Sequence, residues 1–195
     1  MDNRMIWQGE EAKLIIIRGP AGSGKSTLAK MIKKGIDAEA KQTPALTVEA
    51  DDYFYIGGDG YTFDPEQLKD AHKWCRNKVA WLLRNHHTVI LSNCNTFIGH
   101  LEQYLDLAEY FDARVVVYEC TNDFGSIHAP AEVSARMRKN FQPLSQYPKV
   151  QKRIKNHNLY LDNVGGSKFL QGTYDEFQFA EKAKDNRVKE MRLDQ

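Results

Sequence analysis

An apolar run that breaks into a glycine-rich loop constrains this chain more than any other feature. Residues 13–27 read KLIIIRGPAGSGKST, with fixed positions at Gly19, Gly24, Lys25 and Ser26. A loop without bulky side chains lets backbone N–H groups wrap phosphate oxygens, while the lysine neutralises phosphate charge and the serine hydroxyl is a ligand for Mg²⁺. A helix beginning at about Lys25 aims the positive end of its dipole at the same anion. The motif therefore predicts an ATP site with Mg²⁺ on Ser26. Its nucleotide-binding residues are Gly19, Pro20, Ala21, Gly22, Ser23, Gly24, Lys25, Ser26 and Thr27.

Runs of β-branched residues recur along the chain at the spacing of an α/β protein. They occupy residues 13–18, 45–50, 88–92 and 114–119, and helical patterns fill the intervals between the later ones. Strands that alternate with helices form a parallel sheet covered by helices.

Two helices have clear boundaries in the sequence. The first is predicted to begin at Asp64 and Pro65 and to run to about Asn85, because Asp caps a helix N-terminus and Pro fits its first turn. The second is predicted from Ala131 to Asn140, between two prolines. A short strand is also expected at residues 168–170, between glycine turns.

The length of 195 residues suits one core better than two. We predict a single domain over residues 1–195, with a small helical lid at about 125–143 and a basic C-terminal segment at 144–195. No stretch approaches the roughly 20 apolar residues of a membrane span, and the N-terminus lacks the apolar centre of a signal peptide. The three cysteines form neither a C-x-x-C metal site nor a disulfide framework, which favours the cytoplasm.

Basic residues concentrate in the last third of the chain. Between Val133 and Leu161 there are seven Lys and Arg and no acid, with Phe141, Tyr147 and Tyr160 among them. Such a segment could follow the backbone of a nucleic acid and stack its bases. The alternative is a solvated helix face together with Arg residues that close over ATP.

Acidic residues follow the second predicted strand, where Asp51 and Asp52 are adjacent. Ligands of an open α/β sheet bind at the carboxyl ends of its strands, so a carboxylate here faces the γ-phosphate. A phosphotransferase needs such a group to take the proton of the acceptor hydroxyl. Asp51 is the predicted general base. Asp52 is predicted to bind substrate or water-bound Mg²⁺, or to cap the following turn.

The third predicted strand ends in Asn93, where many phosphate-loop proteins carry the acid that organises Mg²⁺. Metal binding then depends on Ser26, the phosphates, water and an acid from the second strand. No Asn-Lys-x-Asp motif for guanine is present, which disfavours a GTPase. Arg136 and Arg138 are predicted to close on the transferred phosphoryl group, since Arg presents a fixed fork of donors. The alternative is that both are surface charges.

The segments GPAGSGKST, ADDYF, DGYTFDPEQLKDAHKWC and HAPAEVSARMRKNFQP together resemble the polynucleotide-kinase-like P-loop kinases. The resemblance covers about residues 13–143 and implies the P-loop kinase fold. It also implies that Asp51 is the general base and that the turn after the third strand, with Asn93 and Asn95, belongs to the acceptor site. Two positions depart from one member of that family: Phe54 stands where that protein has an Arg that holds substrate phosphate, and Asn93 stands where it has an Asp.

The sequence is compatible with three functions. The first is transfer of the ATP γ-phosphate to a hydroxyl of DNA or RNA, most simply a polynucleotide 5′-hydroxyl. The second keeps the reaction but uses a hydroxymethyl group on a modified base, a nucleoside or another small molecule as acceptor. The third is a nucleotide-binding adaptor without transfer activity. The sequence fixes neither the acceptor nor the oligomeric state.

Overall fold

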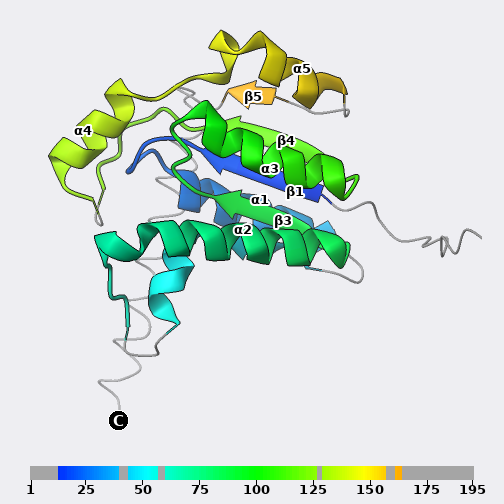
Figure 1. Ribbon diagram of the computed structural model, residues 1–195, viewed down its shortest axis with the longest axis horizontal. Helices are drawn as coiled ribbons and strands as arrows, with labels where there is room; N and C mark the ends of the chain where they lie inside the picture. The colour runs from blue at the N-terminus through cyan, green and yellow to red at the C-terminus, as the bar shows by residue number, and fades with distance from the viewer. Residues whose placement is uncertain (1–12, 40–43, 57–59, 127–128, 157–160, 164–195) are drawn as a thin grey trace, which may run out of the picture.

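A computed structural model describes residues 13–39, 44–56, 60–126, 129–156 and 161–163 of the chain (Figure 1). Its strands form one parallel sheet in the order β2-β3-β1-β4-β5. The strands are β1 (Lys13–Arg18), β2 (Leu46–Val48), β3 (Thr88–Ser92), β4 (Arg114–Glu119) and β5 (Leu161–Asn163). Leu14 of β1 pairs with Val89 on one side and Val115 on the other. The predicted parallel sheet is confirmed, and its central strand leads into the glycine-rich loop.

The sheet is covered by helices on both faces, which explains why its strands are continuously apolar. Leu14 and Ile16 of β1 belong to the core shared with α2 (Leu68–Arg84) and α3 (Ile98–Tyr110). Ile15 and Ile17 belong to the second core, which contains residues of α1 (Lys25–Glu39). Figure 1 shows α2 and α3 on the near side of the sheet and α1 behind it.

Three predicted strands have the expected bounds, while β2 is shorter than the predicted 45–50. It ends early because Ala50 begins a short 3₁₀ helix, η1 (Ala50–Tyr55). The Asp52 carboxylate accepts a hydrogen bond from the Glu49 backbone N–H at 3.0 Å, which caps the first turn of η1 and ends the strand.

The predicted helix start at Asp64 is confirmed. Asp64 Oδ1 accepts from the Glu66 N–H at 2.9 Å, and a 3₁₀ turn, η2 (Pro65–Gln67), leads into α2. The helix predicted at 131–140 is α4 (Ala131–Lys139), which lies beyond the carboxyl ends of the strands (Figure 1). The strand predicted at 168–170 lies outside the described residues.

Beyond α4, the turn η3 (Leu144–Gln146) and helix α5 (Pro148–Asn156) lead to the edge strand β5. Val150 and Ile154 of α5 are buried in the core that α2 and α3 share. Within the described ranges, the helices are all too short or too polar to cross a membrane.

Candidate active site

The loop between β1 and α1 is held in shape by the ends of the neighbouring strands. The Gly19 N–H donates to the Cys94 carbonyl at 3.0 Å, and the Phe124 N–H donates to the Gly22 carbonyl at 2.9 Å. Gly19 cannot be replaced without rearrangement, because a Cβ there would lie 2.1 Å from the Cys120 carbonyl oxygen. The loop therefore has one conformation that the surrounding backbone enforces, as a binding site for phosphate requires.

Lys25 and Ser26 begin α1, at the positive end of the helix dipole. Lys25 is buried, and its Nζ donates to the Pro20 carbonyl at 2.8 Å, across the loop. Ser26 is exposed. The ammonium thus lies against the loop itself, where a phosphate would replace the Pro20 carbonyl as its partner.

Sequence reasoning missed Glu49, the first residue after β2. Its carboxyl group is largely buried, and burial raises its pKa above the usual value. The hydroxyls of Ser92 and Ser26 approach the Glu49 carboxylate and oppose this rise in its pKa. The approach of Ser92 is not an ordinary hydrogen bond, because its Oγ has no partner that meets hydrogen-bond geometry within the described residues. Glu49 is therefore the acid from the second strand that adjoins the predicted Mg²⁺ ligand. Its position directly after a strand is the one signal that could have revealed it.

Asp51 and Asp52, both on η1, have different surroundings. Asp51 is exposed, and its negative charge contributes to the raised pKa of Glu49. Asp52 is half-buried, accepts from the Glu49 N–H, and lies 3.9 Å from Lys78 Nζ. The carboxylate of Asp52 thus serves as a cap, one of the predicted alternatives, while that of Asp51 is available to a ligand.

Asn93 and Asn95 follow β3, and both are buried. Asn93 Oδ1 accepts from the Ala50 N–H at 2.8 Å, which joins the end of β3 to the start of η1. Asn95 has a positive φ of 38°, a region that Asn tolerates better than most residues. Its Nδ2 is buried without a hydrogen-bond partner among the described residues. Of these two predicted acceptor residues, Asn95 retains an unused donor and Asn93 holds η1 in place.

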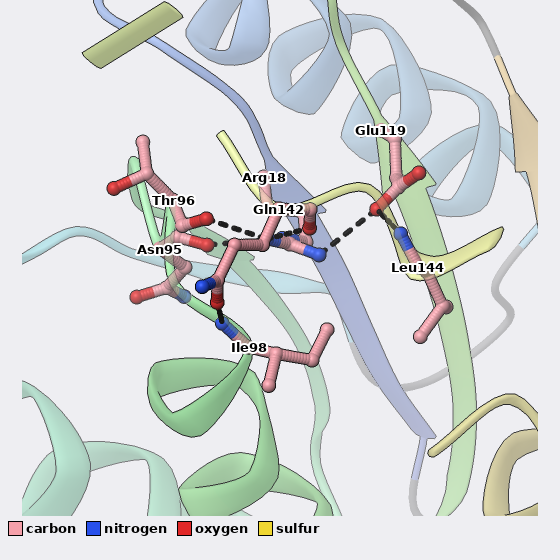
Figure 2. A network of polar contacts seen from close by, with 7 residues as sticks. All are labelled: Arg18, Asn95, Thr96, Ile98, Glu119, Gln142 and Leu144. Carbon is pink, nitrogen blue, oxygen red and sulfur yellow. Dashed lines mark hydrogen bonds and ion pairs between the residues drawn. The ribbon is translucent and has the colours of Figure 1, made fainter. Parts of the chain in front are cut away.

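A buried arginine directly before the loop connects the elements around the site (Figure 2). Arg18 is fully buried and pairs with Glu119 through Nη1 at 2.9 Å. It donates from Nε to the Asn95 carbonyl at 3.0 Å and from Nη2 to the Thr96 and Gln142 carbonyls at 3.1 and 2.9 Å. One side chain thereby links the ends of β1, β3 and β4 with the segment after α4.

The two predicted lid arginines lie on opposite sides of α4, since residues two apart on a helix differ by about 200°. Arg138 donates to the carbonyls of Asn122 at 2.7 Å and Ala21 at 3.2 Å, and it pairs with Asp123 at 2.6 Å. Arg136 is exposed, and no hydrogen bond or ion pair joins its side chain to the described part of the chain. Arg138 is therefore the arginine that contacts the phosphate loop.

The basic C-terminal segment is described only as far as α5. Arg153 attaches α5 to α3, with Nε 2.8 Å from Glu109 and Nη2 2.7 Å from Asp106. Lys149 and Lys152 are exposed. Helix α5 lies beside β5 (Figure 1), at the edge of the sheet opposite β2 and η1. The described basic residues are therefore distant from Asp51 across the sheet.

The residues around Ser26 fit a hard cation that is shared with a nucleotide. Mg²⁺ prefers oxygen ligands and retains several waters, so one or two protein oxygens near the phosphates are enough. The Ser26 hydroxyl and the adjacent Glu49 carboxylate are the two oxygen groups that would hold it. Among the described residues there is no cluster of three or more His, Cys, Asp or Glu that could hold a metal without such a nucleotide.

Comparison with known proteins supports the phosphate-loop interpretation. Residues 14–126 match the family described as AAA domain. A curated relative from Rattus norvegicus, 2′,3′-cyclic-nucleotide 3′-phosphodiesterase, is 31% identical over 109 residues, which are 54% of this chain and 23% of the relative. The chain thus spans less than a quarter of the length of that relative.

Two solved structures show the same fold. APS kinase CysC from Mycobacterium tuberculosis, in complex with AMPPNP and APS, has a TM-score of 0.52 at 13% identity, over 89% of this chain and 99% of that one. A candidate kinase from Chloroflexus aurantiacus has a TM-score of 0.53 at 14% identity, over 91% and 99%. The predicted P-loop kinase fold is confirmed.

Proposed function

This chain belongs to the AAA domain family, and we propose that it is an ATP-dependent phosphotransferase that acts on a hydroxyl group. The observation that carries the proposal is the exposed carboxylate of Asp51. Asp51 lies beside Glu49, and the Glu49 carboxylate in turn adjoins Ser26 of the phosphate loop. A protein that only binds a nucleotide needs the loop but not a free base at its edge.

The phosphate loop and Lys25 bind the triphosphate. Backbone N–H groups at the start of α1 and the Lys25 ammonium face the β- and γ-phosphates, so Lys25 exchanges the Pro20 carbonyl for phosphate oxygens. When bound through Ser26 and Glu49, Mg²⁺ supplies charge that neutralises the phosphate oxygens. The Gly19 and Gly22 backbone contacts fix the shape of the loop, so a bound triphosphate would be held in one position for attack by the acceptor.

Asp51 acts as the general base. It accepts the proton of the acceptor hydroxyl while the oxygen attacks the γ-phosphorus, and ADP leaves from the opposite side. Asn93 keeps η1 in position through the Ala50 N–H, so its role is to orient Asp51. Arg138 is placed at the loop to stabilise charge on the transferred group, provided that it exchanges the Ala21 carbonyl for a phosphate oxygen.

We favour a hydroxyl on nucleic acid, most simply a polynucleotide 5′-hydroxyl, as the acceptor. The motifs from residue 13 to residue 143 support this choice, as does the relative whose name gives a cyclic nucleotide as its substrate. The second candidate is a nucleoside or another small molecule. This candidate is favoured because Arg153 is paired with Glu109 and Asp106 of α3. The basic C-terminal segment therefore has one cation fewer with which to bind a polyanion.

Transfer of label from γ-labelled ATP tests the proposal. The acceptors are 5′-hydroxyl oligonucleotides, duplexes with hydroxymethylated bases, and free nucleosides. Labelling of the oligonucleotide is expected, with a KM that rises with salt because polyanion binding releases counterions. A KM independent of salt would indicate the small-molecule candidate. Tight ATP binding without transfer to any acceptor would leave only the adaptor.

The part assigned to Glu49 is tested by the metal dependence of nucleotide binding. Calorimetry should show that Mg²⁺ strengthens ATP binding to the wild-type protein and does so less for Glu49→Gln. Affinity in the presence of a chelator should be similar for the two proteins, because Gln keeps the shape of the side chain. Equal Mg²⁺ enhancement in both would exclude Glu49 from the metal site.

A further inference from the structure

Exposed apolar side chains gather on the segment that follows Asp51. Of the seven large apolar side chains that are exposed among the described residues, four lie between positions 55 and 68: Tyr55, Ile56, Phe63 and Leu68. Single exposed apolar residues are common on protein surfaces, but their concentration in one place marks a binding surface. We call Tyr55, Tyr61 and Phe63 the aromatic platform.

The platform rests on one buried ring. Phe54 is 4% exposed, and its ring meets Tyr61 and Phe63 edge-on, with centroids 6.1 and 5.2 Å away. Tyr61 lies 5.1 Å from Tyr55 and 6.5 Å from Phe63, the latter pair within 18° of parallel. The Thr62 N–H donates to the Phe54 carbonyl at 3.2 Å and joins the two segments. The outer rings are therefore held in place before any ligand binds, which lowers the entropy lost on binding.

The platform borders the proposed general base. Asp51 and Tyr55 belong to the same short helix, η1. Burial raises the pKa of Tyr61, and the negative charge of Asp51 raises it further, so the two groups are within electrostatic reach. A flat group stacked on these rings would lie close to the carboxylate that accepts the hydroxyl proton.

The negative charge of the segment that bears the platform disfavours a phosphate as its ligand. Residues 49–67 contain six Asp or Glu and no Lys or Arg. The adjacent helix α2 carries Lys69, Lys73, Arg76 and Lys78. Of these, Lys78 already has partners, since its Nζ lies 4.6 Å from the centre of the Trp74 ring and 3.9 Å from Asp52. A phosphodiester would be repelled here, whereas the uncharged face of a nucleobase would lose no favourable contact and gain aromatic stacking.

We propose that the aromatic platform stacks the nucleobase of the acceptor, so that the hydroxyl is recognised through its neighbouring base instead of its neighbouring phosphate. This inference rests on the proposed function and specifies its acceptor: a nucleoside unit, free or in a polymer, whose base is exposed enough to stack. Loss of one stacked base weakens binding by about 5- to 150-fold, which is the expected effect on the acceptor KM.

The test compares two acceptors with two variants. The acceptors are a 5′-hydroxyl oligonucleotide and the same oligonucleotide without its terminal base. The variants are Tyr55→Ala/Phe63→Ala and, as a matched control, Tyr110→Ala, which removes an 82% exposed ring at the far end of α3. The double variant should raise the KM for the complete acceptor by about 5- to 150-fold and leave the KM for ATP unchanged. With the abasic acceptor, wild type and variant should have the same high KM. Tyr110→Ala should match the wild type with both acceptors.

Several results would overturn the inference. One is an unchanged acceptor KM in the double variant, and another is an abasic acceptor that is used as well as the complete one. If another part of the chain covers the platform, the double variant will unfold at lower denaturant concentration without a change in KM, which also contradicts base stacking. If Tyr55→Ala/Phe63→Ala is too unstable to assay, Tyr55→Ala alone is used, because Tyr55 is half exposed.

Failure of the proposed function gives a different result. In that case no acceptor is labelled by the wild-type protein, while nucleoside binding to the platform is still measurable by calorimetry. If the wild-type protein binds a nucleoside and the double variant does not, the platform is supported. The absence of labelling then excludes the transfer reaction alone. Absence of nucleoside binding to the wild-type protein would exclude the platform.

Discussion

Replacing Arg18 with Met removes the side chain that joins the ends of three strands to the segment after α4. Four hydrogen bonds are lost, including the ion pair with Glu119 at 2.9 Å. Met fills much of the same volume, so the expected cost comes mainly from the polar groups left behind. These are the buried Glu119 carboxylate, 4% exposed, and the carbonyls of Asn95, Thr96 and Gln142.

The magnitude follows from the burial of the pair. Removing one partner of a buried ion pair costs about 3–5 kcal/mol, because the other charge stays desolvated. Most natural domains are stable by only about 5–15 kcal/mol. Arg18→Met should therefore lower the free energy of unfolding by roughly a fifth or more. Glu119→Gln should cost less, because its amide oxygen can still accept from Leu144 N and Arg18 Nη1.

The destabilisation should also depend on pH with a definite sign. Burial raises the pKa of Glu119, and Arg18 is one of the groups that oppose this rise. Without Arg18 the folded-state pKa rises further above the unfolded value of 4.5. The folded state then binds the proton more tightly than the unfolded state, so the variant gains stability as pH falls through its folded pKa. The difference between Arg18→Met and wild type should shrink between pH 7 and pH 5.

Urea unfolding followed by circular dichroism at both pH values measures these differences. The matched control is Lys73→Met, which removes an exposed cation from the middle of α2 and should change stability by no more than about 0.5 kcal/mol. A loss below about 1 kcal/mol for Arg18→Met, or a penalty that grows as pH falls, would refute the reasoning from burial.

Five further substitutions test the site itself. Lys25→Ala should abolish transfer and strongly weaken ATP binding, measured by calorimetry, because the triphosphate loses its main charge partner. Asp51→Asn should lower kcat by about 10²–10⁴ with ATP affinity within a few-fold. Asp52→Asn should stay active, since its amide oxygen can still cap Glu49; a larger loss in Asp52→Asn would reverse the two assignments. Arg138→Ala should reduce kcat by about 10² or more, as loss of one donor to the transferred group does. Arg136→Ala should leave kcat unchanged. Equal losses of kcat in Arg136→Ala and Arg138→Ala would contradict the assignment of the phosphate contact to Arg138 alone.

Local patterns determined most of the fold. Three of the predicted strands have the bounds seen in the structure, and the helix start at Asp64 and Pro65 was also correct. These signals are local because strand propensity, helix caps and the glycine-rich loop depend on neighbouring residues alone. The end of β2 was harder to place, since a side chain three residues ahead, Asp52, caps the Glu49 N–H and ends the strand.

Tertiary structure decided which polar residues form the site. Glu49, which sequence reasoning passed over, adjoins Ser26 because the ends of parallel strands meet at one edge of the sheet. Nothing in the local sequence separates Arg136 from Arg138; the direction in which α4 packs turns only the second toward the phosphate loop.

Arg18 illustrates the same limit. It appears in the sequence as a charged residue at the end of a strand, yet it is fully buried, because carbonyls from residues 95, 96 and 142 converge on it. The sequence by itself determined where the phosphate loop and its strands lie along the chain, since those depend on local propensity and spacing. Only the tertiary structure decided which charges are buried, paired or available to a ligand, because the free energy of a charge depends on the groups that folding brings around it.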